Sequence, residues 1–198
     1  TPEAPASRER LVLQHNLGRN LELSGEWDAA QRHFESTLAQ SRELRYPRGQ
    51  AYALLGVASV RNAKRDSADA VRWLDEAQGL LDVVPDEPLR AQILMQRAIA
   101  LRQLRRSAEG LPLLREAIEI FRRSDACAEE ARARDALARG LADGGDWRAA
   151  YDQQQLSGRL SQDLLRQQID QRFATLKVQF DTESKVQENR LLQRENEA

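Results

Sequence analysis

The sequence predicts an all-α protein in which about four helical hairpins stack into a superhelix and a long helix follows at the carboxyl end. Glycine and proline are sparse and fall between segments rich in Ala, Leu, Arg, Glu and Gln, a composition that favours helices. The segment Gly25-Glu26-Trp27-Asp28-Ala29-Ala30 reappears as Gly145-Asp146-Trp147-Arg148-Ala149-Ala150. A fixed repeat of this kind is typical of solenoids, in which each unit buries its apolar face only against its neighbours. Small residues recur at intervals of 40 in two series, Gly18, Ala58, Ala98 and Ala138, and Ala30, Ala70, Gly110 and Ala150.

The repeat units are expected at about residues 8–46, 47–86, 87–125 and 126–160, after a disordered segment over residues 1–7. Apolar residues three and four positions apart predict two amphipathic helices in each of the first three units. The fourth unit is weaker in its second half. The positions that define the helices are Leu11, Leu17, Leu21, Ala30, Phe34 and Leu38; Leu54, Val57, Ala58, Ala70, Leu74 and Ala77; Leu94, Ala98, Leu101, Gly110, Leu114, Ala117 and Ile118; and Leu137, Ala138, Leu141 and Ala150.

Helix ends are predicted by glycine and proline. The turn Ser24-Gly25-Glu26 holds a glycine, which tolerates the left-handed conformation that ends a helix. Pro47, Pro85 and Pro88 fall between units, where a residue that cannot continue a helix is expected.

Residues 161–198 are expected to form a carboxyl-terminal helix, because neither glycine nor proline occurs from Asp163 to Ala198. We expect its first part to cap the open end of the solenoid. Its remainder is expected either to pair with a second copy, as a coiled coil in a homodimer, or to fray, since isolated helices are marginal in water. The apolar residues proposed for dimerisation or signalling are Ile169, Phe173, Leu176, Phe180 and Leu191.

Composition excludes several functions. The 30 basic and 31 acidic residues give a net charge of −1, which indicates neither a nucleic-acid footprint nor a contact with an anionic membrane. No run of 18 apolar residues occurs, so no segment is expected to span a bilayer. No motif for a cofactor or a metal is present, and His15 and His33 lack Cys or acidic partners at ligand spacing. The chain begins without Met and stops within a helical pattern, so we expect it to be a piece of a longer protein.

The repeat resembles the tetratricopeptide repeat (TPR). The family has small residues at its eighth and twentieth positions, a Gly–x–aromatic turn between them and a large apolar residue four later. Gly18, Gly25, Trp27, Ala30 and Phe34 match this pattern in the first unit. The resemblance implies a right-handed superhelix. The period of 40 exceeds the usual one of about 34, which implies longer helices.

In the TPR family the first helix of each hairpin lines a concave face that binds peptides. The resemblance therefore implies a groove for a peptide, a protein or a small acidic ligand. The alternative is an ordinary solvated face with ion pairs within helices, such as Asp135–Arg139. The candidate groove residues are His15, Arg19, Tyr52, Leu55, Asn62, Gln92, Met95, Ile99, Arg102, Arg132, Asp135 and Arg139.

A second resemblance concerns the terminal helix. The stretch from Leu176 to Lys185, with Glu188-Asn189 and Leu191-Leu192, is similar to the segment that follows the repeats in bacterial membrane-bound signalling proteins. In those proteins periplasmic TPR repeats lead into a membrane span and then into a diguanylate cyclase or a histidine kinase. The resemblance implies a periplasmic sensor whose output domain is absent from this chain.

Two functions are therefore carried forward, and neither is catalytic, because no nucleophile, base or metal set is assembled by the sequence. The first is a sensory domain that binds a ligand in the groove and relays the signal through the terminal helix. The second is a soluble, cytoplasmic scaffold that joins protein partners. The segment from Gly144 to Trp147 is interpreted as the turn of the fourth unit, because it aligns with Ser24 to Trp27.

Overall fold

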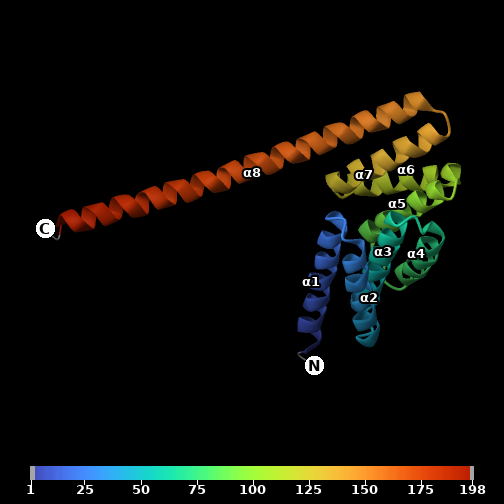
Figure 1. Cartoon of the computed structure of the whole chain (residues 1–198), viewed down its shortest axis with the longest axis horizontal. Coiled ribbons are helices and arrows are strands. Elements are labelled where there is room, and N and C mark those ends of the chain that lie inside the picture. The colour runs from blue at the N-terminus through green and yellow to red at the C-terminus, as the bar shows by residue number, and fades with distance from the viewer. Residues whose placement is uncertain (1–2, 197–198) are drawn as a thin grey trace.

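The computed structural model describes the backbone of residues 3–196 and the side chains of residues 8–186. This part of the chain forms eight helices in paired repeats, and the last helix is far longer than the others (Figure 1). The predicted all-α architecture of helical hairpins followed by a long helix is confirmed. The helices are α1 (Glu3–Leu23), α2 (Trp27–Glu43), α3 (Pro47–Ala63), α4 (Ser67–Leu81), α5 (Glu87–Gln103), α6 (Ser107–Arg123), α7 (Cys127–Asp143) and α8 (Trp147–Asn196).

Each helix packs against the next one in the chain, and α1, α3, α5 and α7 also contact one another in order. The chain therefore stacks neighbour upon neighbour, as a solenoid requires. In Figure 1 the helix direction turns between the α1–α3 part and the α5–α7 part. One difference from the sequence analysis lies at the amino end, where α1 begins at Glu3 rather than at residue 8. Pro5 is compatible with this, because the amides of a first helical turn have no partner within the helix.

The turns between helices follow one design. Gly25 and Gly145 have φ angles of 79° and 82°. Arg45, Arg65, Arg105 and Asp125 occupy the same place in their turns, with φ angles of 47°, 63°, 63° and 53°. In each of these turns the following amide donates to the carbonyl five residues earlier, as from Glu26 to Leu21 at 2.9 Å. These bonds satisfy carbonyls that a helix end leaves free. The left-handed residue recurs every 20 positions, so the 40-residue period is a pair of equal helix-and-turn segments.

The junction between α4 and α5 is the exception. Here the chain uses a longer connection, and the side chain of Asp86 caps α5 by accepting from the amide of Leu89 at 3.0 Å. The same carboxylate pairs with Arg48 at 2.9 Å and accepts from the hydroxyl of Tyr52 at 3.4 Å. Asp86 therefore ties the start of α5 to α3, which compensates for the missing compact turn.

The small residues of both 40-residue series are buried, as the sequence predicts. Their role is clearest around Phe34, whose ring is fully buried between α1 and α3. A Cβ atom added at Gly18 would lie 2.8 Å from this ring, and one added at Gly56 would lie 2.5 Å from it. Only glycine at both positions leaves room for the aromatic ring. Gly110 has the same function in α6, where an added Cβ would lie 3.2 Å from the backbone of Ala98.

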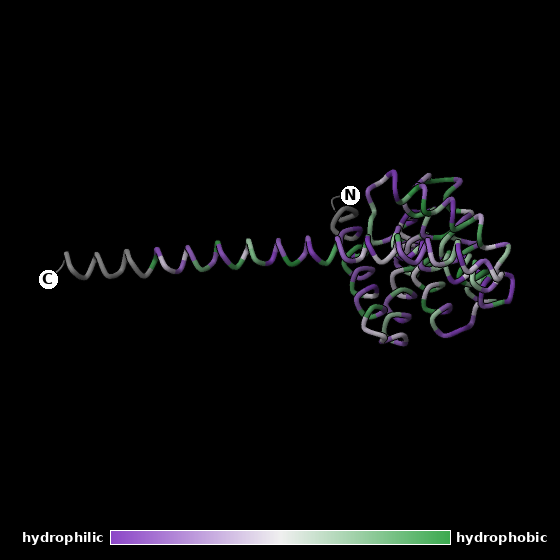
Figure 2. The backbone as a smooth tube through the Cα atoms, turned by 90° about the horizontal axis from the view of Figure 1, so that it is seen from above, coloured by the Kyte–Doolittle hydropathy of each residue, from purple (hydrophilic) through white to green (hydrophobic). Residues whose placement is uncertain are grey.

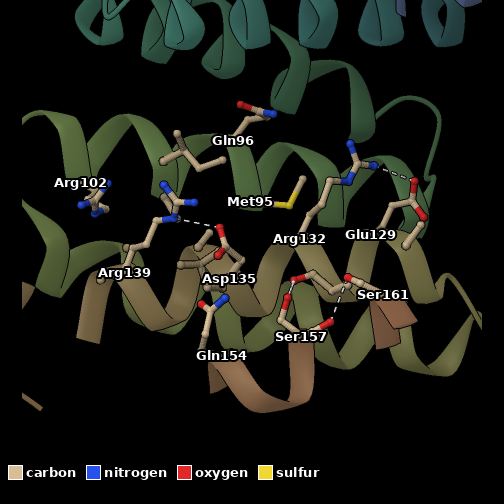
Figure 3. Close-up of a pocket in the computed structure, with 18 of the residues that line it drawn as sticks. Met95, Gln96, Arg102, Glu129, Arg132, Asp135, Arg139, Gln154, Ser157 and Ser161 are labelled. Carbon is tan, nitrogen blue, oxygen red and sulfur yellow. Dashed lines mark hydrogen bonds and ion pairs between the residues drawn. The ribbon is translucent and has the colours of Figure 1, made fainter. Parts of the chain in front are cut away.

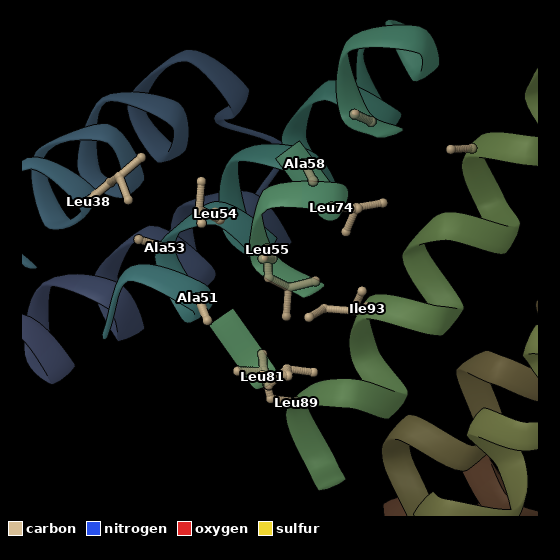
Figure 4. Packing of buried hydrophobic residues seen from close by; sticks show 13 residues of the cluster. Leu38, Ala51, Ala53, Leu54, Leu55, Ala58, Leu74, Leu81, Leu89 and Ile93 are labelled. Atoms are coloured by element: carbon tan, nitrogen blue, oxygen red, sulfur yellow. The ribbon is translucent and has the colours of Figure 1, made fainter. Parts of the chain in front are cut away.

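The core continues along the stack. Figure 4 shows leucines and alanines of α2, α3 and α4 meeting Leu89 and Ile93 of α5. A second cluster joins α5, α6 and α7 and reaches Ala150 at the start of α8. No hairpin closes its own core, because each cluster takes residues from three or four successive helices.

Helix α8 has two parts. Its first part packs on α7, and side chains that are buried or half-buried occur as far as Leu164. From Leu165 to Val186 every side chain is exposed, and in Figures 1 and 2 this part projects away from the repeats as a single rod. The end of the solenoid is covered by the part of α8 up to Leu164, most of which belongs to the fourth unit. The cap expected from residues 161–198 is not observed in the described part, because the side chains from Leu165 to Val186 are exposed and no helix boundary occurs near residue 160.

Replacing Gly56 with alanine should destabilise the protein by about 1–3 kcal/mol, because the new methyl group would overlap the ring of Phe34. Gly79 provides a matched control, since it lies in α4 with no heavy atom within 4 Å of an added Cβ. Gly79→Ala should stabilise the protein by about 0.4–1 kcal/mol. Urea unfolding of the two variants measures both effects. Equal changes in the two would show that Phe34 does not set the helix spacing.

Candidate functional site

The concave side of the stack holds a groove with a volume of about 1190 Å³. Residues of α5, α6, α7 and α8 form most of its wall, and Arg19, Leu23, Ala63 and Arg65 border it at the amino-terminal end. We call this surface the concave groove. Its volume suits a drug-sized molecule or a short peptide segment.

The floor of the concave groove is apolar. Met95 and Ile99 of α5 lie one helical turn apart, and Leu111 of α6 faces the same space. Leu164 and Leu165 close the apolar surface from α8. The small residues Ala98, Gly110, Ala136 and Gly140 also line the groove, and Gly110 and Gly140 pack closely against Ala98 and Leu111. The floor can therefore bury an apolar side chain of a ligand.

The rim is rich in arginine. Five arginines but only two carboxylates, Glu129 and Asp135, line the groove. Figure 3 shows Arg139 paired with Asp135 and Arg132 paired with Glu129, each at 2.8 Å. Pairs this exposed contribute about 0–1 kcal/mol, so a carboxylate of a ligand can replace the intramolecular partner at little cost. The arginines of the groove are Arg19, Arg65, Arg102, Arg132 and Arg139.

Arg102 is held differently from the other arginines. Its Nε donates to Asp143 at 2.8 Å, and the hydroxyl of Ser107 donates to the same carboxylate at 3.0 Å. Burial alone would raise the pKa of Asp143, but the hydrogen bonds from Arg102 and Ser107 outweigh it and hold the pKa below its ordinary value. The carboxylate is therefore charged at neutral pH and fixes Arg102 at the side of the groove.

The structure brings seven of the twelve candidate groove residues together. They are Arg19, Met95, Ile99, Arg102, Arg132, Asp135 and Arg139. The expected Asp135–Arg139 pair is present, and it lies within the groove rather than on a separate solvated face.

Leu55, Asn62 and Gln92 line neither of the two cavities described here. Leu55 is part of the buried core between α2 and α5. Asn62 is buried and donates to the carbonyl of Gln96 at 2.9 Å and to its side-chain oxygen at 3.0 Å. Their placement in the groove is corrected: Leu55 packs into the core, and Asn62 is held against α5 by its hydrogen bonds to Gln96.

His15 and Tyr52 lie in a second cavity of about 360 Å³, between α1 and α3. The ring of His15 packs against Phe34 and Tyr52, with centroid distances of 5.4 and 5.6 Å. Its Nδ1 is buried and has no hydrogen-bond partner among the described residues. Burial, assisted by the nearby charge of Arg19, lowers the pKa of His15 to about 4. The imidazole is therefore neutral at pH 7.

The sequence analysis missed the contribution of α8 to the groove. The sequence does contain a signal, a stripe of small and polar residues at helical spacing. The stripe crosses residue 160, and dividing the chain there into a fourth unit and a separate terminal helix hid it. Ser157 shows how closely this stripe fits, since its hydroxyl donates to the carbonyl of Ala131 at 2.8 Å. The residues of α8 in the groove are Gln154, Ser157, Gly158, Ser161, Leu164, Leu165 and Gln168.

The described residues hold neither a metal-binding group nor a membrane-crossing helix. No group of three or more His, Cys, Asp or Glu side chains there is arranged to hold a metal ion. None of the helices described has the length and the apolarity that crossing a membrane demands.

Neither a protein-family model nor a curated protein matches this sequence. Solved structures do match. A TPR-like protein from Chlorobium tepidum superposes with a TM-score of 0.56 at 18% identity, covering 69% of this chain and 97% of that one. A Podosopora anserina kinesin light chain with nearly identical TPR-like repeats gives a TM-score of 0.51 at 18% identity. The match covers 79% of this chain and 77% of that one. The chain has a TPR-like fold. At this identity the likeness concerns the fold alone, and the resemblance to membrane signalling proteins stays a prediction.

Acidification from pH 7 to pH 5 should destabilise the protein partly through His15. As pH falls, the unfolded state takes up the proton near its pKa of 6.5, whereas the folded state resists protonation until about 4. The contribution of neutral His15 to the free energy of unfolding is fully present above pH 6.5 and decreases as the pH falls towards 4. About 2 kcal/mol of it is lost by pH 5.

Thermal or urea unfolding at pH 7 and pH 5 tests this for the wild type and for His15→Phe, which keeps an aromatic ring against Phe34 and Tyr52. The difference in unfolding free energy between the two pH values should shrink in the variant by about 2 kcal/mol. An unchanged difference would mean that His15 is not the group that titrates.

Proposed function

We propose that this chain is a non-catalytic protein-interaction module that binds a segment of a protein partner in the concave groove. The observation that supports this most strongly is the combination of an apolar floor with an arginine rim on one open concave surface. The TPR-like fold of the solved structures agrees with an interaction role in general.

The chemistry of the groove favours a partner segment that carries both apolar and acidic side chains. Met95 and Ile99 offer apolar contact, and five arginines outnumber two carboxylates around them. Arginine recognises carboxylates with two parallel hydrogen bonds, which adds geometric selectivity to charge attraction. We therefore propose an acidic peptide segment with one or two large apolar residues as the ligand, and a small acidic molecule as the lesser alternative.

The second candidate is the sensory relay. It is favoured by the continuity of α8, which supplies one wall of the groove from Gln154 to Gln168 and then continues as the free rod. A ligand that moves this wall would also move the rod, since both belong to one helix. In this proposal the module is periplasmic and the rod leads to a membrane-linked cyclase or kinase that is absent from the chain.

Charge reversal at the rim tests the binding role. Peptides selected by display against the whole chain should bind about tenfold more weakly to the double variant Arg132→Glu/Arg139→Glu, because two carboxylate contacts become repulsive. Fluorescence anisotropy of a labelled peptide measures the dissociation constant. The matched control is Arg115→Glu/Arg123→Glu, which reverses two exposed arginines of α6 that lie outside the groove. Equal weakening in both variants would point to net charge rather than to the groove.

Hydrogen exchange separates the two candidates. Binding of the selected peptide should slow amide exchange in residues 154–168, which form the groove wall. The relay also requires a change in residues 169–186, whereas a simple interaction module leaves their exchange unaltered.

A further inference from the structure

The rod of α8 carries an apolar face that nothing in the described structure covers. Phe173 is 71% exposed and Phe180 is 72% exposed, and Ile169 and Leu176 lie beside them on the same helix. A lone helix is marginal in water, and exposed apolar patches on rigid elements mark interaction sites. This face therefore requires a partner for the rod to persist as a helix.

The spacing of these residues is that of a two-helix seam. Ile169, Phe173, Leu176 and Phe180 follow one another at intervals of four, three and four, which are the d, a, d, a positions of a heptad pattern. Continued by three residues in each direction, the same pattern places Arg166 before the apolar residues and Glu183 after them. The apolar seam is short and ends at opposite charges, and these charges restrict how a partner can lie.

We propose that the partner is a second copy of this chain, paired antiparallel through residues 163–186 about a two-fold axis between Ala174 and Thr175. In this arrangement Phe173 packs against Leu176 of the second copy, and Ile169 packs against Phe180 of the second copy. Two-fold symmetry forms each contact twice.

The charges support this arrangement. With the axis at that place, Arg166 faces Glu183 of the second copy at the ends of the apolar seam. Beside the seam, Asp170 faces Lys177 of the second copy. All four side chains are exposed, and none of them forms an ion pair with another residue in the described part of the chain. They are therefore available to a partner.

An apolar pair outside the seam fits the same alignment. Leu165 and Val186 occupy flanking positions at opposite ends of the exposed segment, and both are exposed. The antiparallel alignment brings Leu165 against Val186 of the second copy. Two exposed apolar side chains thus gain an apolar neighbour in the same alignment.

A parallel pair of the same two helices would bring like charges together. It would place Arg166 against Arg166 and Glu183 against Glu183 within the seam, where like charges are most costly. It would also bring Arg172 next to Lys177 of the other chain, at the flanking positions that normally hold opposite charges. Charge complementarity therefore selects the antiparallel pair.

The consequence is a bivalent particle. Antiparallel rods place the two repeat domains at opposite ends, so the pair carries two concave grooves, and each groove is bordered at Leu165 by Val186 of the second copy. The relay proposal instead expects the two carboxyl ends to lie together at one membrane. The pairing itself does not depend on what the grooves bind, so a failure of either proposal leaves the other open to its own test.

Charge exchange in the full chain tests the pairing. Arg166→Glu and Glu183→Arg, each alone, should weaken the dimer about tenfold in sedimentation equilibrium, because each places like charges opposite one another twice. The double variant should return to within about twofold of the wild type, because the opposite charges are restored in reversed order. Circular dichroism checks that helix content is unchanged. Single variants that dimerise as well as the wild type would overturn the antiparallel alignment.

Cross-linking decides the orientation independently. In a Cys127→Ser background, chains with Asp170→Cys are mixed with chains carrying Lys177→Cys and treated with a short bismaleimide. The antiparallel pair should give a cross-linked dimer, whereas the mixture of Arg172→Cys with Lys177→Cys, which are neighbours only in a parallel pair, should not. The reverse result overturns the orientation.

Loss of the seam itself provides the last test. Leu176→Asp and Phe180→Asp should each convert the dimer to a monomer, since each removes an apolar layer twice and buries a charge. A wild-type chain that sediments as a monomer at its highest soluble concentration would overturn the proposal, and would assign the apolar face to a different protein.

Discussion

The structure depends on the close approach of successive helices at small residues. Phe34 makes this constraint visible, because its ring occupies space that exists only where Gly18 and Gly56 lack side chains. The aromatic ring joins α1 and α3 from the side of α2, so one contact fixes two neighbouring hairpins at once. The second series of small residues repeats this arrangement along the stack, with the backbone of Ala98 against Gly110. Dense packing of this kind leaves each helix a single register against the next.

A chain of polar side chains strengthens that register between the helices of the concave side. Gln96 donates to Ser59 at 3.1 Å, and Gln103 donates to the carbonyl of Asn62 at 3.1 Å. Ser59 in turn donates to Glu22 of α1. These bonds run from α1 through α3 to α5 among part-buried side chains, where an unpaired amide would be costly. The apolar contacts set the spacing of the helices, and the polar contacts prevent one from sliding along another.

Helix α8 connects the repeat domain to the rod without a break. Its first turns complete the last hairpin, its middle turns form a wall of the concave groove, and its remainder projects alone. One wall of the groove and the apolar residues of the rod therefore belong to the same helix. The chain therefore carries two surfaces of different character, an arginine-rimmed groove and an apolar stripe on the rod with Arg166 and Glu183 at its ends.

The sequence by itself determined the helical class, the 40-residue period and the buried small positions. Those features are local or strictly repeated: turn residues end helices wherever they occur, and a small residue recurs wherever helices touch. It also placed Met95, Ile99 and Arg139 in the groove, because their positions follow from the repeat.

Only the tertiary structure decided which other side chains reach the groove. Leu55 and Asn62 occupy expected positions in the repeat, yet the packing of α3 against α5 buries them. Ser157 and Leu164 reach the groove because α8 does not end where the repeat ends. Such outcomes depend on contacts between segments that are distant in the chain, and a pattern within one helix does not contain them.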